Sequence, residues 1–371
     1  MRALLVVLIA SGPVVATAAD AASSAAPVVD RAWELTGNFR TAVGFKENVL
    51  LSAIHADDSA FTRNEAEIFW WLLPTERFEA LAFANVAHTR FHDSTENPRE
   101  LQAFAHGEAR WYATPTVQAT AIVEGYQLDQ VFDLSASSAE RVTEQLSVTG
   151  GLVSTVFRWD FLPRTWLELK PTAQRDRYRD GSDDNNQQSG RATLGRSWRD
   201  GRIELTLAGQ LLQRNYLYRP RFTAGGRPLF GTDLDFEQRE GELNLTVIWD
   251  KARHWSTVTA AIAGDNRDNG ERYFDYRRRS LRQELVWKNK PWRVRLVGRA
   301  TRYDYDTQEA DIGINPPKRL KEEYLAQLRI ERRLTERALL FADYLWERSR
   351  ANVPLTSYTV KTALAGLDWS F

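Results

Sequence analysis

Apolar and polar residues alternate along most of the chain. In the segment 201–211, Ile203 and Leu205 fall on one face of an extended strand, whereas Glu204 and Thr206 fall on the other. A period of two is typical of a β-strand with one apolar and one wet face. After residue 31 no apolar run approaches the roughly 18–20 residues that a membrane-spanning helix needs. The pattern therefore predicts strands rather than helices.

The alternation recurs to the end of the chain in long segments. Ordinary globular strands average about five or six residues, whereas strands that cross a membrane at a tilt need about 9–11 residues in the hydrocarbon. The segments here are mostly 11–17 residues long, so their length favours strands that span a membrane. We predict sixteen strands, at residues 38–50, 61–73, 78–89, 101–113, 117–130, 142–159, 165–178, 188–199, 202–216, 234–249, 255–265, 273–289, 292–305, 320–334, 338–350 and 358–371.

The connections between these strands alternate in length. Seven are short and eight are longer, which is the plan of a membrane barrel with short periplasmic turns and longer extracellular loops. A soluble β-sandwich has no reason to keep this rhythm, and its strands would be shorter. We therefore predict an all-β fold, a transmembrane antiparallel up-and-down β-barrel. Closure of such a barrel leaves no unpaired backbone group in lipid.

Large aromatic residues are numerous for so polar a chain. The 371 residues include 13 Trp, 12 Tyr and 17 Phe, although 26% are charged and Lys+Arg equals Asp+Glu at 49 each. The absence of cysteine excludes disulfides, thiolate metal sites and cysteine nucleophiles. The neutral balance argues against a nucleic-acid partner, which usually meets a basic excess. A membrane barrel explains the aromatic residues, because aromatic girdles flank its apolar band.

Tryptophan and tyrosine are distributed unevenly along the predicted strands. Most tryptophans border the short turns, whereas many tyrosines border the longer loops, for example Tyr178, Tyr216, Tyr276, Tyr303 and Tyr305. Side chains with an apolar ring and a polar tip favour a membrane–water interface. We therefore interpret the two groups as two interfacial bands. The predicted tryptophan girdle consists of Trp70, Trp71, Trp111, Trp159, Trp249, Trp255, Trp287 and Trp292.

The last predicted strand carries Leu367, Trp369 and Phe371 on its lipid side. Apolar residues at every second position before a final Phe resemble the membrane-insertion signal of bacterial outer-membrane β-barrels, and sixteen is the strand number of the general porins. The resemblance implies an outer-membrane location in a Gram-negative cell, contact with outer-membrane lipid and lipopolysaccharide, and recognition by the barrel-assembly machinery. It implies no cofactor and leaves association into a homo-oligomer open.

The N-terminal residues have the pattern of a secretory signal peptide. Met1–Arg2 supplies a positive start, Leu4–Ala10 is apolar, and 16–18 offers an A-x-A cleavage site. The apolar stretch is too short to span a bilayer. We therefore expect a signal peptide at 1–19, a leader at 20–37 and a single barrel at 38–371.

Charged side chains are expected on the wet faces of the strands, because a basic group on the lipid face near the bilayer midplane costs roughly 2–4 kcal/mol. Their signs are unevenly distributed, and we predict a basic stripe opposed by acidic groups, an arrangement that sets selectivity in pores. The alternative is a lumen filled by paired charges. The predicted pore-lining residues are Arg282, Arg293, Arg295, Arg299, Arg329 and Arg333 for the basic stripe, and Glu65, Glu67, Glu204, Glu240 and Glu242 for the acidic groups.

Candidate chemistry outside the lumen is sparse. His92 and Asp93 are adjacent in a longer loop, and an Asp–His pair could activate water in a barrel hydrolase. The segment 180–185 offers the oxygen ligands of part of a calcium loop but lacks its full spacing. His254, in a short turn, is expected to be an interfacial polar residue. We predict no catalytic, cofactor or metal site.

Three positions modify the plain barrel. Pro171 lies inside a predicted strand, where it would remove a ladder hydrogen bond, so we expect a bulge or an early strand end. The third longer loop, near 131–141, is too short for a large constriction of the kind that general porins have. The sequence Tyr-Arg-Arg-Arg at 276–279 lies where a strand meets the outer surface. It could bind lipopolysaccharide phosphates, and unpaired interfacial arginine is the equal alternative.

The sequence therefore predicts an outer-membrane porin-like channel for passive diffusion of ions or small polar solutes, and not an enzyme. One alternative is a non-conducting structural or accessory barrel of a polysaccharide or protein export system. Another is a barrel hydrolase that uses His92 and Asp93. Conductance separates the first two, and loss of activity in Asp93→Ala is required for the third.

Overall fold

The computed structural model describes residues 33–72, 75, 77–134, 143–250, 255–310, 315–353 and 356–371. The expected signal peptide at 1–19, the leader up to residue 32 and His254 lie outside the described residues. The first strand begins at Trp33, which is earlier than the predicted residue 38. None of the described residues forms a helix that is long and apolar enough to cross a membrane.

Sixteen long strands form one closed antiparallel sheet, which confirms the predicted fold class. Each strand pairs with its neighbours in the sequence, except that a small two-stranded hairpin is inserted between β9 and β12. The bounds are β1 Trp33–Lys46, β2 Ser59–Leu72, β3 Phe78–Phe91, β4 Arg99–Thr114, β5 Val117–Asp133, β6 Thr143–Leu162, β7 Thr165–Tyr178, β8 Asn185–Trp198, β9 Ile203–Tyr216, β10 Arg221–Phe222, β11 Pro228–Leu229, β12 Asp235–Asp250, β13 Trp255–Asp268, β14 Tyr276–Asn289, β15 Trp292–Glu309, β16 Lys318–Arg333, β17 Ala338–Ala351 and β18 Tyr358–Ser370.

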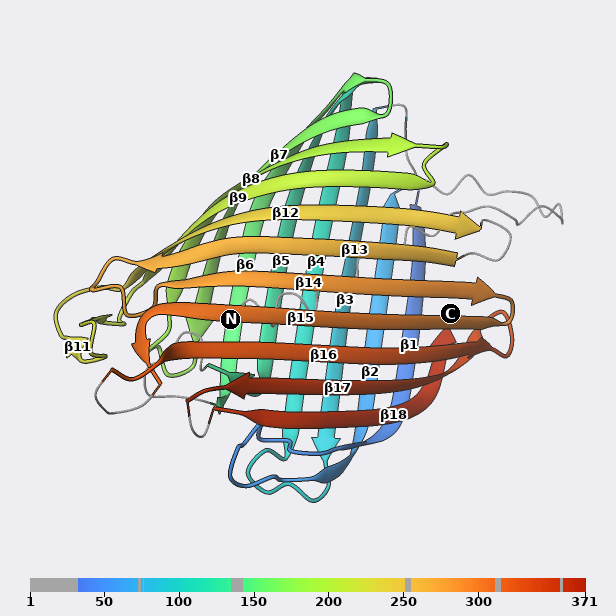
Figure 1. Ribbon diagram of the computed structural model, residues 1–371. Helices are drawn as coiled ribbons and strands as arrows, with labels where there is room; N and C mark the ends of the chain where they lie inside the picture. The colour runs from blue at the N-terminus through green and yellow to red at the C-terminus, as the bar shows by residue number, and fades with distance from the viewer. Residues whose placement is uncertain are drawn as a thin grey trace, which may run out of the picture.

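The predicted alternation of short and long connections is present in the structure. Short turns join β2 to β3, β4 to β5 and so on at one end, called here the turn end, and the longer connections lie at the other, the loop end. Figure 1 shows β12–β18 crossing in front of β1–β6, as expected when the tilted strands of two opposite walls are seen through a barrel. The β10–β11 hairpin lies at the loop end, on the left of the view.

The barrel closes where β1 pairs with β18, from Asn38 opposite Ser370 to Lys46 opposite Thr362. The backbone of Gly37 exchanges hydrogen bonds of 3.1 and 2.9 Å with Phe371. The Phe371 ring lies so close that a Cβ on Gly37 would clash with it. A residue without a side chain is therefore required at position 37 for the ring to take this place.

Alternate residues of every strand face lipid or lumen. Large apolar side chains such as Leu207, Leu243, Leu281 and Leu296 are exposed on the outside of the barrel, which in water would be an aggregation surface and in a bilayer is the expected lipid-facing band. Exposed tryptophans lie on this lipid-facing surface near the turn end: Trp33, Trp111, Trp159, Trp249, Trp292 and Trp369.

Two aromatic assignments are corrected by this alternation. Trp71 follows Trp70 directly, and Trp70 pairs with the exposed, lipid-facing Leu35, so Trp71 points to the lumen and is not part of a girdle. The predicted interfacial band of tyrosines at the loop end is also wrong, because these side chains face the lumen and not the lipid. Tyr178, Tyr216, Tyr303 and Tyr305 are buried on the lumen side, because each has the parity of the lumen-facing positions of its strand.

Pro171 does not end its strand, contrary to the prediction. β7 continues from Thr165 to Tyr178, and its register with β6 is the same on both sides of the proline, from Ser154 opposite Thr172 to Phe157 opposite Leu169. At the two positions between these pairs β6 and β7 are not paired, so the missing N–H of Pro171 interrupts the ladder locally without shifting it.

Candidate functional site

The lumen wall is the candidate site, and all eleven predicted pore-lining residues face it. In β14 the exposed Leu281 places Arg282 and Glu284 on the lumen side, and in β15 the exposed Leu296 does the same for Arg293, Arg295 and Arg299. Arg329 and Arg333 of β16, Glu65 and Glu67 of β2, Glu204 of β9 and Glu240 and Glu242 of β12 have the same orientation in their strands.

The strands β14, β15 and β16 form a strongly basic wall. Their lumen faces carry ten basic side chains against three acidic ones, so an excess positive charge lines one side of the lumen. The basic residues are Arg278, Arg282, Lys288, Arg293, Arg295, Arg299, Arg319, Lys321, Arg329 and Arg333, and the acidic ones are Glu284, Glu323 and Glu331.

Two of the three carboxylates of this basic wall are each shared by two cations. Glu284 accepts hydrogen bonds from Arg282 at 2.7 Å and from Arg295 at 2.8 Å. Glu331 lies 2.7 Å from Arg329 and 3.4 Å from Arg293. Sharing holds the arginines in fixed positions and still leaves the wall net positive.

The wall that continues from the basic strands, from β17 round to β5, is acidic. Strands β17, β18 and β1–β5 present ten carboxylates to the lumen against four basic side chains. The acidic residues are Glu34, Glu65, Glu67, Glu79, Glu100, Glu108, Glu124, Asp343, Glu347 and Asp368, and the basic ones are Arg40, Lys46, Arg63 and Arg110. Positive and negative charges therefore predominate on different stretches of the wall, and, of the acidic strands, β4 and β5 lie across the lumen from β14 and β15.

Three of the predicted acidic residues do not belong to this acidic stretch. Glu204 lies on β9, and Glu240 and Glu242 lie on β12, which is separated from the basic β14 by a single strand. Glu240 is 3.5 Å from Arg278, and Glu242 is 2.8 Å from Arg191. These two carboxylates therefore compensate basic groups of their own side. Glu65 and Glu67 lie in the acidic stretch on β2, where Glu65 is 3.2 Å from Arg40.

A histidine that the sequence analysis left out lies in the acidic wall. His106 approaches Glu124 at 3.0 Å and Glu108 at 3.7 Å, and its ring stacks on Phe83 with centroids 5.1 Å apart. Arg110 completes this group with a 2.6 Å contact to Glu108. The signal was present in the sequence, because His106, Glu108 and Arg110 share one face of a strand.

Charges in the middle of the lumen are partly exposed, whereas those at the loop end are buried. The side chains of Arg40 and Arg282, half-way along β1 and β14, are 28% and 26% exposed, although they point into the barrel. The side chain of Lys321, near the loop end of β16, is 1% exposed. Water therefore reaches the central walls, and the loop end is packed.

The end of β5 reaches across to distant strands at this packed end. Asp133, the last residue of β5, lies 2.8 Å from Nζ of Lys321 on β16 and accepts a 2.9 Å hydrogen bond from the hydroxyl of Tyr358 on β18. Six strands separate β5 from β16 along the shorter way round the wall. Residues 135–142 of the predicted third loop lie outside the described residues, and the described end of β5 reaches β16 and β18 through Asp133.

Other connections add to the packing at the loop end. Phe222 of the β10–β11 hairpin packs with Tyr216, Leu234, Phe236 and Phe274 in one buried cluster. The Arg219 guanidinium lies over the rings of Tyr216 and Phe274 and 3.5 Å from Asp183. These contacts fix the longest loop against the barrel.

The candidate calcium segment 180–185 uses its oxygens for local structure. Asp184 accepts a 2.6 Å hydrogen bond from the backbone N–H of Tyr178, and Asp180 accepts one of 2.7 Å from the Ser182 hydroxyl. Within the described part of the chain, no group of three His, Asp or Glu side chains is placed to hold a metal ion.

The adjacent His92 and Asp93 are not arranged as a catalytic pair in the structure. The backbone N–H groups of both donate to the hydroxyl of Ser59, at 3.1 and 3.0 Å, and the Asp93 carboxylate accepts from the N–H of Ala60. Ser59 is fully buried and donates to a backbone carbonyl. This geometry makes the segment a structural connection to β2.

The chain matches no protein-family model, and no curated protein matches it in sequence. Solved structures similar to it include OccAB3 of Acinetobacter baumannii, at 10% identity over 91% of this chain and 99% of that chain with a TM-score of 0.49. The outer membrane protein OpdK of Pseudomonas aeruginosa is similar at 9% identity over 91% and 99%, with a TM-score of 0.47. OmpT, an outer membrane protein of Vibrio cholerae, follows at 10% over 91% and 97%, with a TM-score of 0.45. At these values the likeness does not identify a function.

Proposed function

We propose that this protein is a water-filled channel of the bacterial outer membrane, through which ions and small polar solutes diffuse passively. The observation that carries the proposal is the separation of a basic and an acidic stretch of the wall, with charged side chains half-way along their strands that are partly exposed inside the barrel. Barrels of about 16 strands leave an aqueous channel. A solute with both polar and charged groups would cross a transverse field between the two walls.

We place the narrowest part of the channel at the loop end, where Asp133 of β5 contacts residues of β16 and β18. Solutes must pass beside the contact of Asp133 with Lys321 and Tyr358 before they reach the wider charged lumen. The packed mouth favours small solutes over large ones. The proposal therefore combines a constriction at the loop end with charge selection in the centre.

Planar-bilayer recording in a salt gradient tests both parts. Replacing Arg293, Arg295 and Arg299 by Glu reverses three charges on the basic wall, so the reversal potential should shift towards cation preference. Glutamine at the same three positions removes the charges without reversing them and should give a smaller shift of the same sign. A matched control places Glu at Arg277, Arg348 and Arg350, which face outward on β14 and β17, and should shift the potential far less.

Two results would count against the proposal in different ways. Absence of conductance from the folded wild-type barrel would overturn the channel and leave an accessory barrel of an export system. An unchanged reversal potential in the folded lumen variants would reject the basic wall as the selecting element. The export alternative has no specific support in the structure, and the arrangement of His92 and Asp93 does not favour a hydrolase.

A further inference from the structure

The lipid-facing surface of β9 and β12–β16 contains a hollow of about 690 Å³. It forms because small residues, Gly241, Ala261, Ala263 and Ala300, follow one another across neighbouring strands. Larger lipid-facing side chains, Leu207, Leu243, Leu281 and Tyr324, stand around this floor. The hollow is thus an apolar depression in the membrane-facing wall, separate from the lumen.

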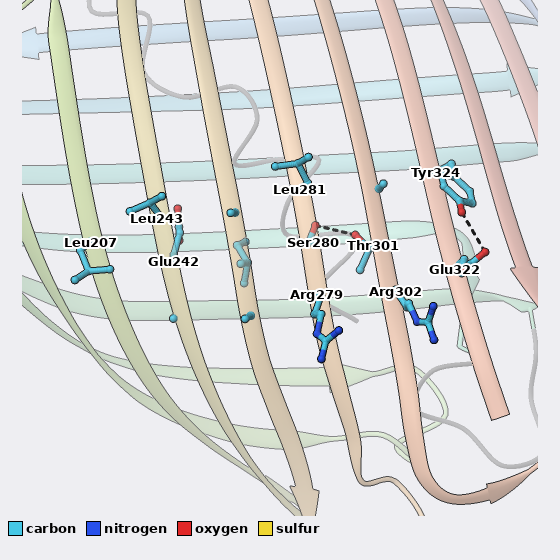
Figure 2. Close-up of a pocket in the computed structure, with 15 residues that line it drawn as sticks. Leu207, Glu242, Leu243, Arg279, Ser280, Leu281, Thr301, Arg302, Glu322 and Tyr324 are labelled. Carbon is cyan, nitrogen blue, oxygen red and sulfur yellow. Dashed lines mark hydrogen bonds between the residues drawn. The ribbon is translucent and has the colours of Figure 1, made fainter. Parts of the chain in front are cut away.

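Two arginines stand at the loop-end rim of this hollow. Figure 2 shows Arg279 and Arg302 side by side, on the loop side of Leu281. They are direct cross-strand partners on β14 and β15, and both are exposed on the lipid-facing surface. Like charges directly opposite each other on one face of a sheet are destabilising.

The surrounding carboxylates compensate only one of the two arginines. Arg302 forms a 2.8 Å ion pair with Asp304. Glu322, the cross-strand neighbour of Arg302 on the other side, accepts a 3.0 Å hydrogen bond from the hydroxyl of Tyr324. Arg279 has Ala263 as its other cross-strand neighbour, and no residue in the described ranges forms a hydrogen bond or ion pair with it. The rim therefore carries one uncompensated positive charge next to a second guanidinium.

We propose that this hollow binds a phosphorylated, acylated lipid of the leaflet at the loop end, with an acyl chain on the small-residue floor and a phosphate between Arg279 and Arg302. The guanidinium fork matches phosphate oxygens in two parallel hydrogen bonds. An anion at this point also removes the repulsion between the two arginines. The apolar floor lies directly on the membrane side of the cations, as the acyl chain lies beneath a phosphate headgroup.

This inference goes beyond the channel function and does not depend on conductance, since the hollow lies outside the barrel. Its test is native mass spectrometry of the folded full-length protein in detergent, titrated with diphosphoryl lipid A. The compared proteins are the wild type, Arg279→Gln with Arg302→Gln, and Ala300→Phe, which fills the floor and keeps both arginines. The matched control is Arg175→Gln with Arg177→Gln, two exposed lipid-facing arginines near the loop end of β7.

The wild type should retain one lipid, and the variant without Arg279 and Arg302 should bind at least tenfold more weakly, which corresponds to about 1.4 kcal/mol. The β7 control should stay within about twofold of the wild type. Fully dephosphorylated lipid A should bind the wild type as weakly as intact lipid A binds the double variant. Ala300→Phe should weaken binding of the intact lipid, because the acyl chain loses its place.

Three outcomes would overturn the proposal. Equal losses in the β7 control and the Arg279/Arg302 variant would show unspecific attraction to anionic lipid. Displacement of the lipid by millimolar inorganic phosphate, with no effect of Ala300→Phe, would show a site for the phosphate alone. Assembly of the wild type into oligomers that retain no lipid and that Ala300→Phe separates would show that the hollow receives a second copy of the chain.

Discussion

Replacing Asp133 by Asn tests whether the crossing contact sets the width of the channel. The substitution keeps the shape of the side chain and removes its charge. Asp133 currently accepts the Tyr358 hydroxyl at 2.9 Å and pairs with Lys321 at 2.8 Å. Lys321 is almost completely buried, and its other partner in the structure is Glu323 at 2.9 Å.

The free energy lost on replacing Asp133 by Asn follows from the burial of Lys321. Removing one partner of a buried ion pair costs about 3–5 kcal/mol, and the lower end applies because Glu323 still compensates the ammonium. A loss of about 3 kcal/mol changes the ratio between the state in which Asp133 contacts Lys321 and the state in which this contact is broken by roughly a hundredfold. The state with the broken contact should therefore become visible in the variant while it is rare in the wild type.

Single-channel recording measures this balance directly. Asp133→Asn should switch between the wild-type conductance and a larger one, and the larger level should be occupied far more often than in the wild type. Asp129→Asn is the matched control, because Asp129 lies on the same strand but is only half-buried and accepts a hydrogen bond from Gln145 at the barrel surface. Identical conductance and noise in Asp133→Asn and wild type would refute the crossing contact as the constriction, as would zero coupling in a cycle with Lys321→Met.

Two stability predictions follow from the barrel wall. Gly37→Leu should lower the temperature at which the folded barrel unfolds on a heat-modifiability gel, because a Cβ at position 37 meets the Phe371 ring; unfolding at the wild-type temperature would show that the ring moves aside freely. Leu281→Arg should lower the free energy of unfolding in vesicles by about 2–4 kcal/mol, whereas Ser280→Arg, on the lumen face, should cost much less. Equal losses in these two variants would contradict the assignment of faces in β14.

The sequence is sufficient to predict the number of strands, the alternation of short and long connections, and the charged face of each strand. Each of these depends on a local period of two. Once Leu281 is assigned to lipid, Arg282 must face the lumen, and the same parity places Arg295 and Arg329. The predicted start of β1 is too late, although the same alternation already runs through Trp33, Glu34, Leu35 and Thr36. This segment pairs with β2 from Trp70 to Leu72.

The mistaken tyrosine band has a different physical cause. Nearness to a loop fixes the height of a residue in the membrane but not its direction, and Tyr303 and Tyr305 have the parity of the lumen. They are buried there by contacts such as the 5.4 Å packing of Tyr303 on Tyr276. The crossing of Asp133 was equally inaccessible, because it joins residues 188 positions apart in sequence.

The closure of β1 on β18 has a consequence for how the protein is made. Arg40 and Asp368, paired at 2.7 Å across this junction, are 328 residues apart, so the ladder that seals the wall joins the most distant parts of the sheet. Until both strands are in place, two edges with free N–H and C=O groups would face hydrocarbon, where each unsatisfied group costs several kcal/mol. Insertion of fewer than sixteen strands therefore has no stable product in lipid, and a cell that makes this chain must shelter both edges until the last strand arrives.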